Sequence, residues 1–327
     1  MSDVKTWRLF TGFLVVPMVG CVAGNRPDFS VYGSESEGKT FYLDGAGNFG
    51  VGKESIPLGL AEGGYLGRVE HFIWTTYMGP LVDQMYLEHN RREARSLARR
   101  IERYKSRWPD RPVNIVALSA GTGIAVFALE EIRQGTHVDN VVLLSSSLSA
   151  AYPMAPALDR VDGGVYVFWS PDDPILRGVV PIVGTVDRAG FGAQSAGTFG
   201  MRLPPGTPER IRERYRKVHN VRWYPGPPRN MVDKVVKFNH AGTTSKAFIR
   251  ELVAPILLLP DASTTSVRMG DSVRKSGSPG DRLSRMDPVR TAPHRASPRI
   301  GAESAHHAAH DAAPDRGATS PTRSASD

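Results

Sequence analysis

The chain has a single cysteine, Cys21, among its 327 residues. One cysteine cannot form a disulfide within the chain, and structural zinc sites built on thiolates need several. The histidines show no ligand spacing either, and His306, His307 and His310 stand in a segment without a framework of further ligands. The sequence therefore predicts no metal site and no cofactor.

The N-terminal apolar run is too short to cross a bilayer as a helix. Residues 9–19 make a core of about a dozen residues, whereas a spanning helix needs about 20. Lys5 and Arg8 precede this core, which is the arrangement of a signal peptide. The core leads to Met18-Val19-Gly20-Cys21, which resembles a bacterial lipobox with methionine at the position where leucine is usual.

The lipobox resemblance implies that Cys21 carries the lipid of a mature lipoprotein. The protein would then lose residues 1–20 and be anchored by its acyl chains to a membrane of the cell envelope, on the periplasmic or extracellular side. Two alternatives stay open, a buried anchor helix and an ordinary cleaved signal followed by a chance cysteine.

The formal net charge of +8 raises the question of nucleic-acid binding. The basic residues concentrate in two runs, 91–107 and 210–217, and glutamates are interleaved with both. Such runs are typical of solvated helix faces with ion pairs. No zinc-finger, RNA-recognition or helix-turn-helix pattern accompanies them, so we expect no nucleic-acid partner. In a lipid-anchored protein a basic face would lie close to anionic headgroups, as an accessory contact.

Composition divides the chain into four segments. A signal peptide is predicted at 1–20, a linker at 21–38 and a folded domain at 39–260. Residues 261–327 are rich in Ser, Arg, Ala, Pro, Asp and His and have scarcely any large apolar residue. Such a segment buries too little surface to offset its chain entropy, so a disordered tail is predicted.

The folded segment alternates strand-like and helical patterns. Strands are predicted at 40–43, 113–118, 141–144, 165–169 and 221–224, and helices at 91–108, 124–132 and 244–252. The strand-like runs are apolar without alternation, which indicates strands covered on both faces. The predicted fold class is α/β, with a mostly parallel central sheet flanked by helices on both faces.

Ser119 follows the second of these strands, within Ala117-Leu118-Ser119-Ala120-Gly121. The pattern small-x-Ser-x-small is typical of a sharp turn from strand to helix that exposes the serine hydroxyl at the carboxyl edge of a sheet. The following helix would point its N-terminus at this hydroxyl and favour negative charge there. The alternative is an ordinary Gly/Ser-rich turn without a catalytic role.

Two more residues complete a triad in chain order. Asp173 stands in the loop after the strand 165–169, and His240 stands between the last strand and the last helix. Together these features resemble the α/β-hydrolase superfamily over residues 40–259. The resemblance implies that Ser119 is the nucleophile, His240 the base and Asp173 the acid. Asp172 competes for the acid role, and Asp173 is preferred because Pro174-Ile175 follows it, as is common in the family.

The same resemblance implies an oxyanion hole of backbone N–H groups from Ala120 and from the loop after the first strand, at Gly45 and Ala46. Many lipases and esterases have His-Gly in that loop, whereas this chain has Asp44-Gly45. A carboxylate facing an oxyanion would be repelled, so we expect Asp44 to turn away and hold the glycine loop. An ordinary Gly-rich turn is the alternative.

The sequence as a whole predicts a serine hydrolase of the carboxylesterase or lipase kind, acting on a small-molecule or lipid ester at the cell envelope. Amide or thioester hydrolysis with the same triad remains open. So does an inactive lipoprotein that uses the fold for binding. Any lid would come from the Gly-rich insert around residues 182–203.

Overall fold

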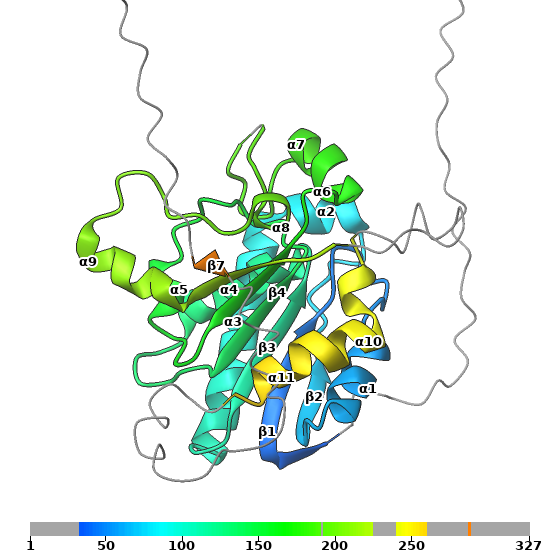
Figure 1. The fold of residues 1–327 in the computed structure, drawn as a ribbon, viewed down its shortest axis with the longest axis vertical. Coiled ribbons are helices and arrows are strands. Elements are labelled where there is room, and N and C mark those ends of the chain that lie inside the picture. Colours follow the sequence, from blue (N-terminus) through cyan, green and yellow to red (C-terminus); the bar gives the residue numbers. More distant parts are fainter. Residues whose placement is uncertain (1–32, 191, 225–239, 260–286, 289–327) are drawn as a thin grey trace, which may run out of the picture. The chain divides into compact units, whose positions relative to one another are not determined.

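The computed structural model describes residues 33–190, 192–224, 240–259 and 287–288, all within the compact unit Met1–Ala292. Its centre is one sheet in the order β2-β1-β3-β4-β5-β6-β7 (Figure 1). Six strands run parallel: β1 (Ser34–Leu43), β2 (Gly67–His71), β3 (Val113–Leu118), β4 (Asn140–Leu144), β5 (Val165–Trp169) and β6 (Val218–Arg222). The α/β architecture with a mostly parallel sheet is therefore as predicted.

The sheet has one short antiparallel strand at its edge. β7 (Asp287–Pro288) pairs with β6. These two residues belong to the segment for which the sequence predicts disorder, so β-pairing extends further along the chain than composition indicates.

Neighbouring residues of the central strands lie in different hydrophobic clusters. Ile115 and Val141 lie in the first cluster, and Val116 and Val142 lie in the second. Because successive side chains of a strand point to opposite faces, the two clusters are the two faces of the sheet. Both faces are buried, which explains why the strands are apolar without alternation.

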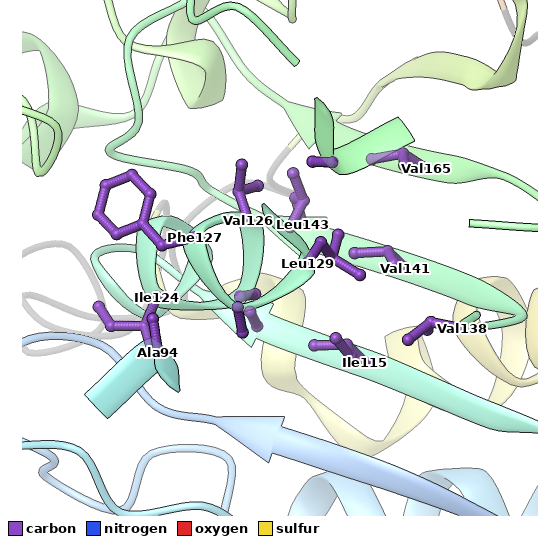
Figure 2. Packing of buried hydrophobic residues seen from close by; sticks show 14 of the residues in the cluster. Ala94, Ile115, Ile124, Val126, Phe127, Leu129, Val138, Val141, Leu143 and Val165 are labelled. Atoms are coloured by element: carbon purple, nitrogen blue, oxygen red, sulfur yellow. The ribbon is translucent and has the colours of Figure 1, made fainter. Parts of the chain in front are cut away.

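The first face is covered by α3 (Leu87–Arg107), α4 (Gly121–Glu131) and α5 (Ala155–Leu158). Figure 2 shows α4 side chains, among them Leu129, packed beside Val141 and Leu143 of the sheet. The face of α3 that meets the cluster is a stripe with helical spacing, Ala94, Leu97, Ala98 and Ile101. The opposite face of α3 carries the basic residues that the sequence places on a solvated face.

The second face is covered by α1 (Ser55–Glu62) and by the C-terminal helical segment. That segment begins as α10 (Lys246–Phe248), widens into a π-helical turn, η5 (Ile249–Val253), and continues as α11 (Ala254–Leu257). The predicted single helix 244–252 is thus longer and irregular. Pro255 explains the irregularity, because its nitrogen has no hydrogen to donate to the preceding turn.

Short helices lie at the carboxyl ends of the strands. Figure 1 shows α2 (Pro80–Met85), α6 (Pro174–Gly178) and α7 (Val180–Val183) gathered there. Gln84 Nε2 of α2 donates to the carbonyl of Gly184 directly after α7, at 3.0 Å. Three further short elements belong to the insert between β5 and β6: α8 (Ala196–Phe199), α9 (Glu209–Arg212) and the 3-10 turn η2 (Glu213–Lys217).

β6 begins and ends earlier than predicted, at 218–222 in place of 221–224. His219 lies inside this strand, and its ring stacks on that of Tyr166 at 4.8 Å between centroids. Burial lowers the pKa of His219 below its ordinary value. These contacts give His219 a structural role in the sheet.

The second basic run forms ion pairs, as the interleaved glutamates predict. Arg212 contacts Glu209 and Arg216 contacts Glu213, each three residues apart on α9 and η2. In the first run most contacts join different elements, such as that of Arg100 with Glu70 of β2. The pairs of the second run are largely exposed, so each of them contributes about 1 kcal/mol or less to stability.

Candidate active site

The fold marks one position as the natural place for a ligand. From β1 the chain crosses by α1 to β2 on one side, and from β3 it crosses by α4 to β4 on the other. β1 and β3 are neighbours in the sheet, with Leu43 opposite Ala117 at their carboxyl ends. Loops that diverge from two such strands leave a crevice, where open α/β sheets bind ligands.

Ser119 lies at this crevice, in the turn from β3 to α4. Its φ of 51° is in the left-handed region, which is strained for a residue with a side chain. Its N–H is held by the carbonyl of Leu144 on β4, at 2.9 Å. Gly121 allows the turn, because a Cβ there would lie 2.5 Å from the carbonyl oxygen of Asp44. The sharp turn that the sequence pattern indicates is therefore present.

His240 and Asp173 form a hydrogen-bonded pair. Nδ1 of His240 lies 2.8 Å from Oδ2 of Asp173, whose side chain is fully buried. Oδ1 of the same carboxylate accepts from the N–H groups of Ile175 and Leu176, and so caps α6. Asp172, the competing acid, is exposed. With Nδ1 donating to Asp173, Nε2 of the neutral imidazole presents a lone pair.

Ser119 and His240 line one cavity of about 510 Å³, which we call the Ser119 cavity. Gly45 and Ala46 line it as well. Among the hydrogen bonds of the described residues, none joins Ser119 Oγ to the imidazole. Catalytic hydrogen bonds are often long in the absence of substrate, so the shared cavity is the relevant observation.

Asp44 holds the loop 45–51, which follows β1. Its carboxylate accepts from the N–H groups of Gly45, Gly50 and Val51, at 2.8, 2.6 and 3.1 Å. It also accepts from the hydroxyl of Tyr42, whose pKa is raised well above its ordinary value by burial and by this neighbouring charge. The expectation that Asp44 ties down the glycine loop is confirmed.

A second carboxylate, Asp83 of α2, holds the same loop from another side. It is fully buried and accepts from the N–H groups of Gly47 and Thr76 at 2.8 Å, and from the hydroxyls of Thr75 and Thr76. Burial alone would raise the pKa of Asp83, but these hydrogen bonds outweigh it and leave the pKa below its ordinary value. Sequence reasoning missed this residue, because its partner Gly47 is 36 positions away.

The two carboxylates determine which backbone donors stay open. The N–H of Gly45 already donates to Asp44, so it is not available to an oxyanion. Gly45 instead leaves room beside the serine, because a Cβ at position 45 would lie 3.2 Å from the Cβ of Ser119. The N–H groups of Ala46 and Ala120 have no acceptor among the hydrogen bonds of the described residues. Of the three positions that sequence reasoning named for the oxyanion hole, Ala46 and Ala120 thus carry the open donors.

Several predictions from the sequence fall outside the described residues: the signal peptide 1–20, Cys21, and His306, His307 and His310. In the part of the chain that the structure describes, no group of three or more His, Cys, Asp or Glu side chains could hold a metal ion. No described helix is both long enough and apolar enough to span a membrane. Comparison with models of protein families and with curated proteins finds no match to this sequence.

Proposed function

We propose that the chain is a serine hydrolase of the α/β-hydrolase superfamily, which cleaves carboxylic esters by acyl transfer. The observation that carries the proposal is the hydrogen bond between Asp173 and His240 at the cavity that Ser119 also lines. The three residues follow the chain order Ser, Asp, His. A buried acid, an oriented imidazole and a serine on a strained turn are the parts of a nucleophilic triad.

In the first half of the reaction, Oγ of Ser119 attacks the ester carbonyl carbon while Nε2 of His240 takes the hydroxyl proton. The carbonyl oxygen becomes an oxyanion. When the carbon–oxygen bond to the alcohol breaks, His240 returns the proton to the leaving alcohol, and an acyl-enzyme remains. Asp173 stabilises the imidazolium that forms between these steps and keeps the ring in the correct tautomer.

In the second half, water takes the place of the alcohol. His240 accepts a proton from water as its oxygen attacks the acyl carbon, and then protonates Ser119 as the acyl–serine bond breaks. The carboxylic acid leaves and the enzyme is restored. The N–H groups of Ala46 and Ala120 are the proposed donors to the oxyanion in both halves. One such donor lowers the barrier by about 2.7–4 kcal/mol.

The proposed location is the cell envelope, with a lipid on Cys21 as the anchor. This part of the proposal is supported by the sequence alone: the charged start, the short apolar core and the sole cysteine at its end. The proposed partners are accordingly an ester substrate and a membrane, the latter reached through the anchor.

A fluorophosphonate probe tests the hydrolase proposal, because it reacts only with an activated serine. We expect one label per chain, located at Ser119 by peptide mass analysis, and none after heat denaturation. Ser147→Ala is a matched control, since Ser147 lines the same cavity and its hydroxyl bonds to Gln84. Labelling should persist in Ser147→Ala and vanish in Ser119→Ala. A folded wild-type protein that takes no label would refute the proposal.

A further inference from the structure

The walls of the Ser119 cavity are apolar beyond the reacting groups. The residues that matter here are Val51, Leu81, Leu118, Ile175, Val180 and Val183. They come from the loop 45–51, α2, the end of β3, α6 and α7. A cavity of about 510 Å³ is of the size that binds small molecules, which range from about 300 to 1,000 Å³.

The polar side chains of the wall are already paired. Ser147 Oγ donates to Oε1 of Gln84 at 3.2 Å, and Nε2 of Gln84 donates to the carbonyl of Gly184. The carboxylate of Asp44 is occupied by the loop 45–51 and by Tyr42. None of the described residues that line the cavity is Lys or Arg. Among the described residues, the wall thus offers no cation to an anionic substituent, and its serine hydroxyl and glutamine amide are engaged with other groups of the protein.

We propose that this cavity binds the aliphatic acyl chain of the ester, so that the substrates are esters of fatty acids and not of short or polar acids. The inference rests on the proposed function, because the carbonyl carbon bonded to Ser119 is what fixes one end of the chain. The rest of the acyl chain would lie between the lining residues of α2 on one side and those of α6 and α7 on the other.

The mouth of the cavity supports the same occupant. Phe49, Leu81 and Val179 line the cavity and are 74%, 54% and 44% exposed. Exposed apolar side chains that line one site are typical of surfaces that bind apolar ligands. An acyl chain in the cavity would remove these side chains from water and be removed from water itself.

The test is the dependence of kcat/KM on acyl length, measured with p-nitrophenyl esters below the concentration at which they aggregate. We expect kcat/KM to rise about fourfold per added methylene from acetate to hexanoate, which corresponds to about 0.8 kcal/mol per buried methylene. The rise should level off once the chain fills the cavity.

Two adjacent residues of α7 provide a matched pair of variants. Val183 lines the cavity, whereas Ile182 is 67% exposed and does not. Val183→Phe should lower the ratio of kcat/KM for octanoate to that for acetate at least tenfold, because the added ring occupies the space of the chain. Ile182→Phe should leave the ratio as in the wild type. Leu81→Asp, at an exposed position, provides a second test that does not disturb the core, and should also lower the ratio.

Three results would overturn the inference: an acetate ester preferred to longer ones, equal ratios in Val183→Phe, Leu81→Asp and Ile182→Phe, or a length preference confined to the alcohol part of acetate esters. Each of them can occur in a protein whose Ser119 takes the fluorophosphonate label, and the hydrolase proposal then stands. Failure to label at all would instead remove the proposed function, and this inference with it.

Discussion

The carboxylate of Asp83 accepts a hydrogen bond of 2.8 Å from the backbone N–H of Gly47, across 36 positions of sequence. Asp44 accepts from three other N–H groups of the same loop. Between these anchored positions the N–H of Ala46 has no acceptor among the hydrogen bonds of the described residues, and Ala46 lines the same cavity as Ser119. The position of a proposed oxyanion donor is therefore fixed by two buried carboxylates that accept from its neighbours.

Asp83→Asn should lower kcat by about ten- to a hundredfold and change KM little. The amide offers one acceptor oxygen where the carboxylate offers two, so a donor among Gly47, Thr75 and Thr76 loses its partner and the loop shifts. Displacing one oxyanion donor costs up to about 10²–10³ in kcat. Steady-state kinetics with one ester measures the effect. Asp172→Asn, at an exposed aspartate, is the control, and an unchanged kcat in Asp83→Asn would contradict the assignment.

Ser119→Ala and His240→Ala should each lower turnover by about 10⁴-fold or more, because serine is a weak nucleophile until a base accepts its proton. The double variant is the sharper measurement. When two residues act as one unit, each single variant loses about as much activity as the double variant. If the double variant instead lost the product of the two single losses, the triad assignment would fall.

Asp173→Asn should lower kcat by about 10⁴-fold, since an amide favours the wrong tautomer of His240. Asparagine is as good a helix cap as aspartate, so α6 and the melting temperature should be retained. Circular dichroism and thermal melts check the fold, and hydrolysis rates check the chemistry. Loss of activity in Asp172→Asn, with Asp173→Asn unaffected, would reverse the roles of the two residues.

Acid sensitivity should depend in part on His219. Burial lowers its folded pKa below the ordinary value of 6.5. Below about pH 6.5 the unfolded chain therefore takes up a proton that the folded chain does not, and stability falls as the pH falls. His219→Phe keeps a ring against Tyr166 and removes the proton, so its melting temperature should drop less between pH 7 and pH 5. His219→Gln loses the stacked ring and should melt lower at pH 7 with the same weakened pH dependence. A wild-type pH slope in both variants would exclude this contribution.

Cys21→Ser should prevent lipid attachment and leave the α/β domain folded. Intact-mass analysis of the wild type should show a chain without residues 1–20 and with added acyl mass on Cys21. In a detergent phase separation the wild type should enter the detergent phase and the variant should not. An unmodified wild-type chain that still starts at Met1 or Ser2 in a soluble fraction would rule out the anchor, and the hydrolase proposal would be unaffected.

The parts of this fold that could be predicted from sequence are those buried on both sides. β5 lies at 165–169 as predicted, because an unbroken apolar run has one explanation in a parallel sheet. β2 was missed, since Gly67–His71 carries arginine, glutamate and histidine at the edge of the sheet, where they reach water or charged partners. Helix α2 was missed because its six residues are too few to show a helical period.

The candidate site divides in the same way. The order of Ser119, Asp173 and His240 follows from loops that each come after a strand or precede a helix, and such positions can be read locally. The pairing of His240 with Asp173, across 67 positions, needs the fold. The fold is also needed to see that the N–H of Gly45 is not an open donor, because this depends on the direction of the Asp44 side chain.

The two oxygens of Asp173 serve different elements. One orients His240, and the other starts α6, whose Ile175 lines the cavity. A substrate too bulky for the cavity would push on α6, which Asp173 caps. Because the same carboxylate holds the imidazole of His240, a shift of α6 would also shift that imidazole. Poor fit is then expressed as slow proton transfer and not only as weak binding. In the proposed hydrolase, wrong substrates would then be rejected after they bind, at the step where the acyl–serine bond is made.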